Sequence, residues 1–107
     1  MHFTSYLQNG QLTIALTGEI DHHCAKKYIQ AISAKIEAYI PGVCILDFQD
    51  VSFMDSSGIA VVINSMRNMS RINGELLLSG LREQPKKVFV ASGIDQLVKI
   101  KENNHEI

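Results

Sequence analysis

Two short segments of the sequence combine residue types that could carry chemistry, and each begins with an aspartate. One is Asp55-Ser56-Ser57-Gly58, where two hydroxyls follow an acid in the order typical of a helix start. A serine hydroxyl there can attack a bond as a nucleophile or accept a phosphoryl group. Glycine inside a helix costs about 1 kcal/mol relative to alanine, so Gly58 predicts a close approach by another group. These residues alone favour a plain capped helix, with phosphorylation of Ser56 as the alternative.

The other segment is Asp21-His22-His23-Cys24, whose four side chains are all metal ligands by type. Successive helical residues point about 100° apart and do not converge on one ion, so a capping Asp21 and two partly exposed histidines are expected instead. A serine hydrolase built from Ser56, a histidine and an aspartate is the enzyme alternative, but the G-x-S-x-G pattern is absent. The nucleotide-binding patterns are absent too. We expect no catalytic residue, no metal and no cofactor.

Periodic apolar patterns place both segments at helix starts in an α/β fold. Two alternating stretches flank Asn9-Gly10, which suits a two-residue turn, so we expect an opening β-hairpin whose second strand ends at Gly18. Apolar steps of three and four predict helices, and apolar runs predict the strands between them. The expected strands are 2–8, 11–17, 43–48, 76–78 and 97–100, and the expected helices are 22–40, 56–72 and 85–92.

The predicted order is β-β-α-β-α-β-α-β, a mixed central sheet with helices packed on it and right-handed crossovers. Residues 43–46 are apolar without alternation, which predicts a central strand covered on both faces. The chain of 107 residues has the size of one domain, and the polar tail at 102–107 is expected to be frayed.

Charge and apolar content exclude several classes of partner. The formal net charge is −1 without a Lys/Arg-rich stretch, so we expect no nucleic acid. No apolar run is long enough to cross a bilayer and no signal-peptide pattern opens the chain, which predicts a cytoplasmic protein without a membrane partner. Cys24 and Cys44 fall at an expected helix start and in an expected buried strand, a poor arrangement for a disulfide.

Three stretches together resemble a known family: GEIDHH at 18–23, LDFQDVSFMDSSGI at 46–59 and NGELLLSG at 73–80. In this order and spacing they are similar to the bacterial STAS-domain anti-sigma factor antagonists, most closely the sporulation type, over nearly the whole chain. The resemblance implies a single STAS domain, 1–107, that is phosphorylated on Ser56 by its anti-sigma factor, a serine kinase that itself binds the ATP. The unphosphorylated form then binds this kinase and releases the sigma factor, and a separate serine phosphatase resets the phosphorylated form.

The resemblance and the helix-start pattern together predict a docking surface for the kinase around Ser56. Phe53 and Met54 are expected as exposed contacts in a loop, and Asp21 as the main contact at the other helix start. The expected partner-binding residues are Asp21, His22, His23, Phe53, Met54, Asp55, Ser56, Ser57 and Gly58. The alternative is a STAS module with a different client, such as a stress-response assembly or a lipid-transport complex, although GEIDHH favours the sporulation type.

Overall fold

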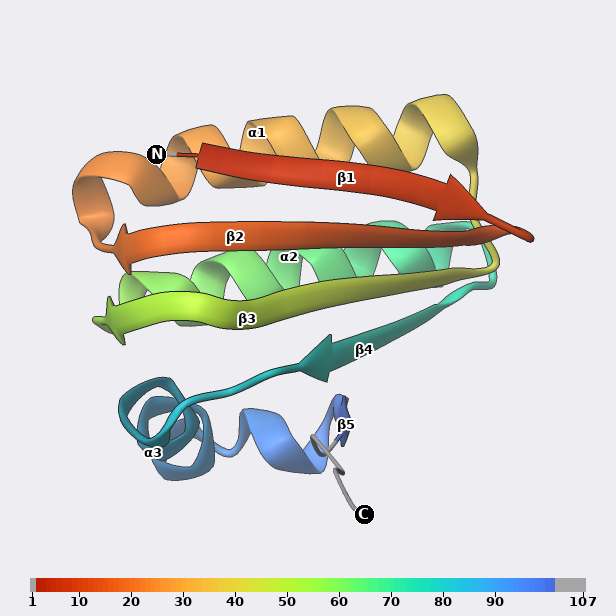
Figure 1. The fold of residues 1–107 in the computed structure, drawn as a ribbon. Coiled ribbons are helices and arrows are strands. Elements are labelled where there is room, and N and C mark those ends of the chain that lie inside the picture. Colours follow the sequence, from red (N-terminus) through yellow and green to blue (C-terminus); the bar gives the residue numbers. More distant parts are fainter. Residues whose placement is uncertain (1, 102–107) are drawn as a thin grey trace, which may run out of the picture.

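A computed structural model describes residues 2–101 of the protein, which form one five-stranded sheet with helices packed on it (Figure 1). In chain order the elements are β1 (His2–Gln8), β2 (Gln11–Ile20), α1 (His22–Tyr39), β3 (Val43–Met54), α2 (Ser57–Arg71), β4 (Glu75–Ser79), α3 (Glu83–Ser92), a 3₁₀ turn (Ile94–Gln96) and β5 (Lys99–Lys101). This order confirms the prediction and adds the short 3₁₀ turn. The expected frayed tail at 102–107 lies outside the described residues.

The strands lie side by side in chain order, β1-β2-β3-β4-β5, so β3 is central as predicted. β1 and β2 are antiparallel, whereas β3, β4 and β5 each run parallel to the strand before them. A two-residue turn is enough for the first connection, and each parallel connection contains a helix. The carboxyl ends of the parallel strands therefore meet at one end of the sheet.

The opening hairpin has the predicted turn. Asn9 and Gly10 have φ values of 53° and 77°, the two left-handed conformations of a type I′ turn. The prediction that the second strand ends at Gly18 is wrong, because β2 continues to Ile20. Gly18 adopts a φ of 85°, and the register with β3 shifts on both sides of it. The glycine therefore permits an irregularity inside the strand instead of a break.

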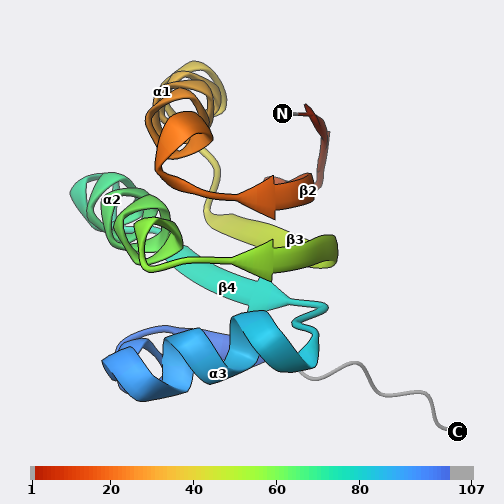
Figure 2. The same cartoon turned by 90° about the vertical axis from the view of Figure 1, so that its left-hand side faces the viewer.

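The helices cover one face of the sheet, where α1 and α2 lie next to each other (Figure 2). This layer and the strand side chains beneath it make the core. Among its fully buried members are Leu12, Ile14, Leu16, Leu46 and Phe48 from the sheet and Tyr28, Val61 and Val62 from the helices. α3 lies beyond β4 and joins the same core through Phe89, whose ring meets that of Phe48 edge-on at 5.5 Å between centroids.

The prediction that β3 is covered on both faces is wrong, since no described helix lies on the second face. Ile45 alternates with the core residues of β3 and so points to that open face, yet it is only 6% exposed. Its register partners Thr13 and Leu77 flank it on the neighbouring strands. Ile45 is therefore buried on the face that carries no described helix, between its neighbours on the adjacent strands.

Other boundaries also differ from the sequence prediction, and α3 begins two residues earlier than expected, at Glu83. β3 is longer and ends at Met54, so the first two residues of FMDSSG belong to a strand. The last strand is shorter, because Leu97 follows the 3₁₀ turn and is 64% exposed. Only Lys99–Lys101 pairs with β4.

Candidate functional site

The two segments that begin with aspartate lie next to each other at one end of the sheet. The last residues of β2 and β3, Ile20 and Met54, are register partners in the parallel pair. Asp21 and Asp55 follow them directly, and the N–H of Asp55 donates to the carbonyl oxygen of Ile20 at 3.1 Å. α1 and α2 therefore both begin at this end of the sheet, as Figure 1 shows. The two helix starts form one composite site.

Asp21 is the N-cap of α1, as predicted. Its backbone is extended, and its carboxylate accepts hydrogen bonds from the N–H groups of His23 at 2.9 Å and Cys24 at 3.2 Å. Desolvation acts to raise the pKa of Asp21, but the hydrogen bonds from Cys24 and His23 outweigh it and lower the pKa below the ordinary value of 3.8. The Cys24 thiol adds a donated contact to the carbonyl oxygen of Glu19 at 3.4 Å. We call this helix start closed, because the side chains of Asp21 and Cys24 already make these hydrogen bonds within the protein.

His22 and His23 follow the cap on the surface. Both are exposed, with ring centroids 4.0 Å apart, and Nδ1 of His23 lies 3.7 Å from Oδ2 of Asp21. Residues 2–101 contain no group of three or more His, Cys, Asp or Glu side chains arranged to hold a metal ion. The two imidazoles therefore add exposed polar ring surface next to Asp21.

The start of α2 is built around Asp55 and an unused hydroxyl. Oδ1 of Asp55 accepts a hydrogen bond from the N–H of Ser57 at 2.8 Å, and the helix begins at Ser57, one residue later than predicted. The N–H groups of Gly58 and Ile59 donate to the carbonyls of Asp55 and Ser56, both at 3.1 Å. Ser56 is exposed and its hydroxyl makes no capping hydrogen bond. The hydroxyl is thus accessible to a visiting protein.

Met54 corrects the prediction of an exposed contact, because its side chain is completely buried at the end of β3. It lies under Gly58, where an added Cβ would collide with Sδ and Cγ of Met54. The close approach that Gly58 predicts is thus made by the protein's own Met54, and Gly58 is itself buried. Phe53, one residue earlier, remains 43% exposed as expected. Phe53 can meet a partner directly, whereas Met54 and Gly58 support the site from below.

Gln84 is a residue of this site that the sequence did not indicate. Its amide oxygen accepts from the N–H of Met54 and its amide nitrogen donates to the carbonyl of Met54, both at 2.9 Å. β4 pairs with β3 only as far as Asp47 and Ser79. Seven residues further along β3, at Met54, the side chain of Gln84 from α3 makes the backbone hydrogen bonds that a neighbouring strand would make. A lone glutamine in a short helix carries no sequence signal for such a contact.

The composite site carries negative charge. Glu19, Asp21 and Asp55 surround the two helix starts, Glu19 being the register partner of Phe53. Two lysine ion pairs, Lys87–Glu83 on α3 and Lys99–Glu75 between β4 and β5, lie away from this site. Neither of them involves Glu19, Asp21 or Asp55.

Comparison with known proteins identifies the family of this chain. The STAS domain model matches residues 3–107. The chain belongs to the STAS domain family. The relatives of this STAS domain include the anti-sigma F factor antagonist of Lysinibacillus sphaericus, which is 34% identical over 88% of this chain and 81% of its own length. The anti-sigma-B factor antagonist of Listeria monocytogenes is 29% identical over 84% of this chain and 78% of its own length.

Solved structures of the anti-sigma factor antagonist SpoIIAA resemble this STAS domain over its whole described length. The unphosphorylated form has 28% sequence identity and a TM-score of 0.83, covering 97% of this chain and 90% of its own. The phosphorylated form of SpoIIAA from Bacillus has the same identity and a TM-score of 0.74, covering 97% and 93%. The fold prediction of a STAS-like mixed sheet is thereby confirmed.

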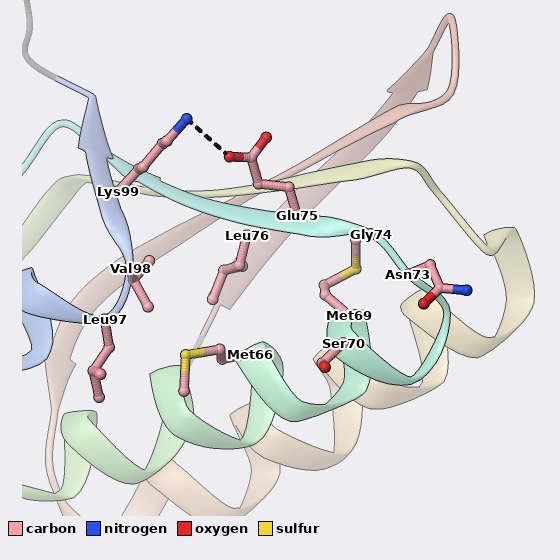
Figure 3. A pocket seen from close by; sticks show the side chains of 10 residues that line it. All are labelled: Met66, Met69, Ser70, Asn73, Gly74, Glu75, Leu76, Leu97, Val98 and Lys99. Atoms are coloured by element: carbon pink, nitrogen blue, oxygen red, sulfur yellow. Dashed lines mark ion pairs between the residues drawn. The ribbon is translucent and has the colours of Figure 1, made fainter.

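One cavity of the STAS domain lies away from the two helix starts. It has a volume of about 490 Å³ and lies at the opposite end of α2, against β4 and β5 (Figure 3). Met66, Leu97 and Val98 give it apolar walls, and the ion pair between Glu75 and Lys99, at 3.2 Å, crosses its rim. None of the described helices is long and apolar enough to span a membrane.

Proposed function

We propose that this STAS domain is an anti-sigma factor antagonist whose binding is switched off by phosphorylation of Ser56. In its unphosphorylated form it binds an anti-sigma factor that is a serine kinase, and the sigma factor is released. The kinase supplies the bound ATP, a serine phosphatase restores the hydroxyl, and the exchange takes place in the cytoplasm. The observation that carries the proposal is the exposed, unbonded hydroxyl of Ser56 at the start of α2.

Added charge at Ser56 would act on a partner more than on the fold. A phosphate brings about −1.5 to −2 charges, and the N-terminal end of a helix favours negative charge. The N–H groups of Ser57, Gly58 and Ile59 already have acceptors at 2.8–3.1 Å. A phosphate on Ser56 therefore needs no rearrangement of the helix and stays in solvent beside the Asp55 carboxylate. A protein surface that fits the bare hydroxyl then meets concentrated negative charge.

The exposed residues of the composite site define where the partner contacts the domain. Phe53 offers an exposed apolar side chain three residues before Ser56, and Asp21, His22 and His23 offer polar groups from the neighbouring helix start. Asp55 and Ser57 are half-buried and hold the local backbone. We infer that Phe53 and Asp21 contribute most to docking, while Met54 and Gly58 act only through the shape of the site.

A different client is the second candidate. The named relatives antagonise two different anti-sigma factors, one for sigma F and one for sigma B. The identity to two sigma F relatives is 34% and 24%, on either side of the 29% to the sigma-B relative, so identity does not separate the two clients. Parallel titration against an anti-sigma F and an anti-sigma-B factor distinguishes the two by their affinity ratio.

The decisive experiment incubates the protein with the anti-sigma factor and ATP and maps the modification by mass spectrometry. Modification at Ser56, and its loss in Ser56→Ala, is expected. By calorimetric titration Ser56→Ala should bind like the wild type, whereas Ser56→Asp should bind at least about tenfold more weakly, or about 1.4 kcal/mol.

Ser70→Asp is the matched control, since it adds the same charge at an exposed serine near the other end of α2. It should leave the affinity unchanged. Equal affinity of Ser56→Asp and the wild type, or modification of another residue, would contradict the proposed switch.

A further inference from the structure

The two edges of the sheet are protected very differently. β5 is three residues long and two of them are lysines, the kind of short, charged edge that resists pairing with another chain. β1 at the opposite edge has seven residues in unbroken register with β2 and contains no Asp, Glu, Lys, Arg or Pro. Edge strands normally carry such residues to prevent association. β1 therefore lacks the usual protection against a further strand.

The hairpin fixes which backbone groups of β1 face outward. In a two-residue hairpin the residues flanking the turn, here Gln8 and Gln11, exchange both of their backbone hydrogen bonds. Alternate residues of an antiparallel strand bond to the same neighbour, so Tyr6 and Thr4 also turn toward β2. The N–H and C=O groups of Phe3, Ser5 and Leu7 consequently face the free edge. Three residues are thus available for pairing.

We propose that this edge pairs with β1 of a second copy of the same chain, antiparallel and centred on Ser5. The strand is complementary to itself in this register, because Phe3 then lies opposite the second copy's Leu7 on each side of the two-fold axis. Both side chains share the core-facing side of the sheet, since their register partners in β2, Leu16 and Leu12, are buried. Like charges do not oppose each other anywhere along the strand, and the contact is the same patch on both copies.

Exposed apolar side chains occur on β1 near the hairpin turn and at the end of α1. Leu7 is 45% and Tyr6 62% exposed on β1, while Tyr39 and Ile40 at the end of α1 are 46% and 67% exposed. The end of α1 adjoins the hairpin turn, because the N–H of Gly42 donates to the carbonyl of Gly10 at 2.9 Å. Ile40 holds a φ of 44°, an uncommon conformation for a β-branched residue. Among these side chains, Leu7 lies on the edge strand itself, and pairing with a second copy would cover it through the Phe3 of that copy.

The dimer leaves the proposed switch accessible. Pairing runs along the side of β1, whereas Ser56 lies at the ends of β2 and β3, beyond the carboxyl ends of the strands. The two sheets of five strands would continue as one sheet of ten strands. Because the two copies run antiparallel, their Ser56 residues would lie at opposite ends of the strands. The inference is therefore independent of whether Ser56 is phosphorylated.

The test is sedimentation velocity of the whole chain over a concentration series up to about 1 mM, which detects weak complexes. The wild type should pass from monomer to dimer, and Ser5→Pro should stay monomeric throughout. Proline removes only the outward N–H of Ser5 and leaves the bonds of β1 to β2, so thermal unfolding should still be cooperative. Proline on an edge strand with its nitrogen toward solvent is well tolerated.

A charged pair of variants keeps the test sharp if Ser5→Pro does not fold. Ser5→Lys places two ammonium groups opposite each other across the two-fold axis and should abolish the dimer. Gln8→Lys puts the same charge on the same strand, but away from the axis, and should still dimerise. A wild type that remains monomeric at every concentration overturns the proposal, as does equal dimerisation of Ser5→Lys. If the wild type forms no dimer and Ser5→Lys loses binding to the anti-sigma factor, the proposed dimer is wrong. The edge of β1 would then pair with a strand of the anti-sigma factor.

Discussion

The starts of α1 and α2 are two versions of the same construction. Each follows a strand of one parallel pair, each has an aspartate directly after that strand, and each aspartate accepts a backbone hydrogen bond from the helix. The three residues after the aspartate differ completely: His22, His23 and Cys24 at one start, Ser56, Ser57 and Gly58 at the other.

The difference separates a closed helix start from one with an exposed hydroxyl that caps nothing. At α1 the carboxylate takes two N–H groups, and the Cys24 thiol contacts the preceding strand. At α2 the carboxylate takes one N–H group, the hydroxyl of Ser56 has no capping role, and Gly58 lets the helix settle on Met54. The two helix starts thus share one backbone arrangement but differ in their side chains, since only the start of α2 has an exposed hydroxyl without a capping role.

The largest expected effect concerns the residue three positions after each aspartate. Gly58→Ala should lower the free energy of unfolding by about 1–3 kcal/mol, because the new methyl group overpacks the site against Met54. Cys24→Ala at the equivalent position of α1 should cost about 1 kcal/mol or less, since a thiol is a weak hydrogen-bond donor. Urea unfolding of both variants gives the two values.

A double variant shows whether Met54 is the cause. In a Met54→Ala background the space under residue 58 is vacant, so Gly58→Ala should become neutral or stabilise by up to about 1 kcal/mol through helix propensity. A Gly58→Ala penalty of the same size in both backgrounds would assign the glycine to another constraint.

The two caps provide the next comparison. Asp55→Ala removes one capping acceptor and should cost about 1 kcal/mol of stability, while Asp21→Ala removes the acceptor of two N–H groups and should cost more. Thermal unfolding with each aspartate replaced by alanine and by asparagine measures both. Asparagine retains an acceptor and should restore most of the loss, and equal losses in Asp21→Ala and Asp55→Ala would remove the distinction between a doubly and a singly bonded cap.

Local signals explain why much of the fold was predictable. Asn9-Gly10 specifies its turn through the φ values that only a few residues adopt easily, and the aspartates specify both helix starts. The chain order of strands and helices followed from apolar periodicity and turn residues. The two helix starts lie side by side because parallel strands bring their carboxyl ends together.

The errors occurred where distant parts of the chain decide the outcome. Met54 belongs to a polar-looking loop sequence, yet the register shifts between β2 and β3 turn its side chain into the core. The hydrogen bonds of Gln84 to Met54 bridge thirty positions and leave no local pattern. The strand of Ile45 was expected to be covered on both faces, but no described helix lies on the second face, where Ile45 is buried between neighbouring strands. Apolar periodicity indicates which residues are buried, but it does not indicate which parts of the chain cover them.

The smallest predicted effect is a pH dependence confined to the closed helix start. Hydrogen bonds hold the pKa of Asp21 below 3.8 in the folded protein, so between these two values the unfolded chain binds more protons than the folded one. The stabilisation by the Asp21 carboxylate is therefore complete well above pH 3.8 and is lost as the pH falls through the lowered pKa. Asp21→Asn keeps a capping oxygen without this titration, and the difference in urea midpoint between wild type and Asp21→Asn should shrink on going from pH 6 to pH 3. A difference that grows on acidification would mean that the charged carboxylate is not what the N–H groups of His23 and Cys24 favour, and the two helix starts would then be alike.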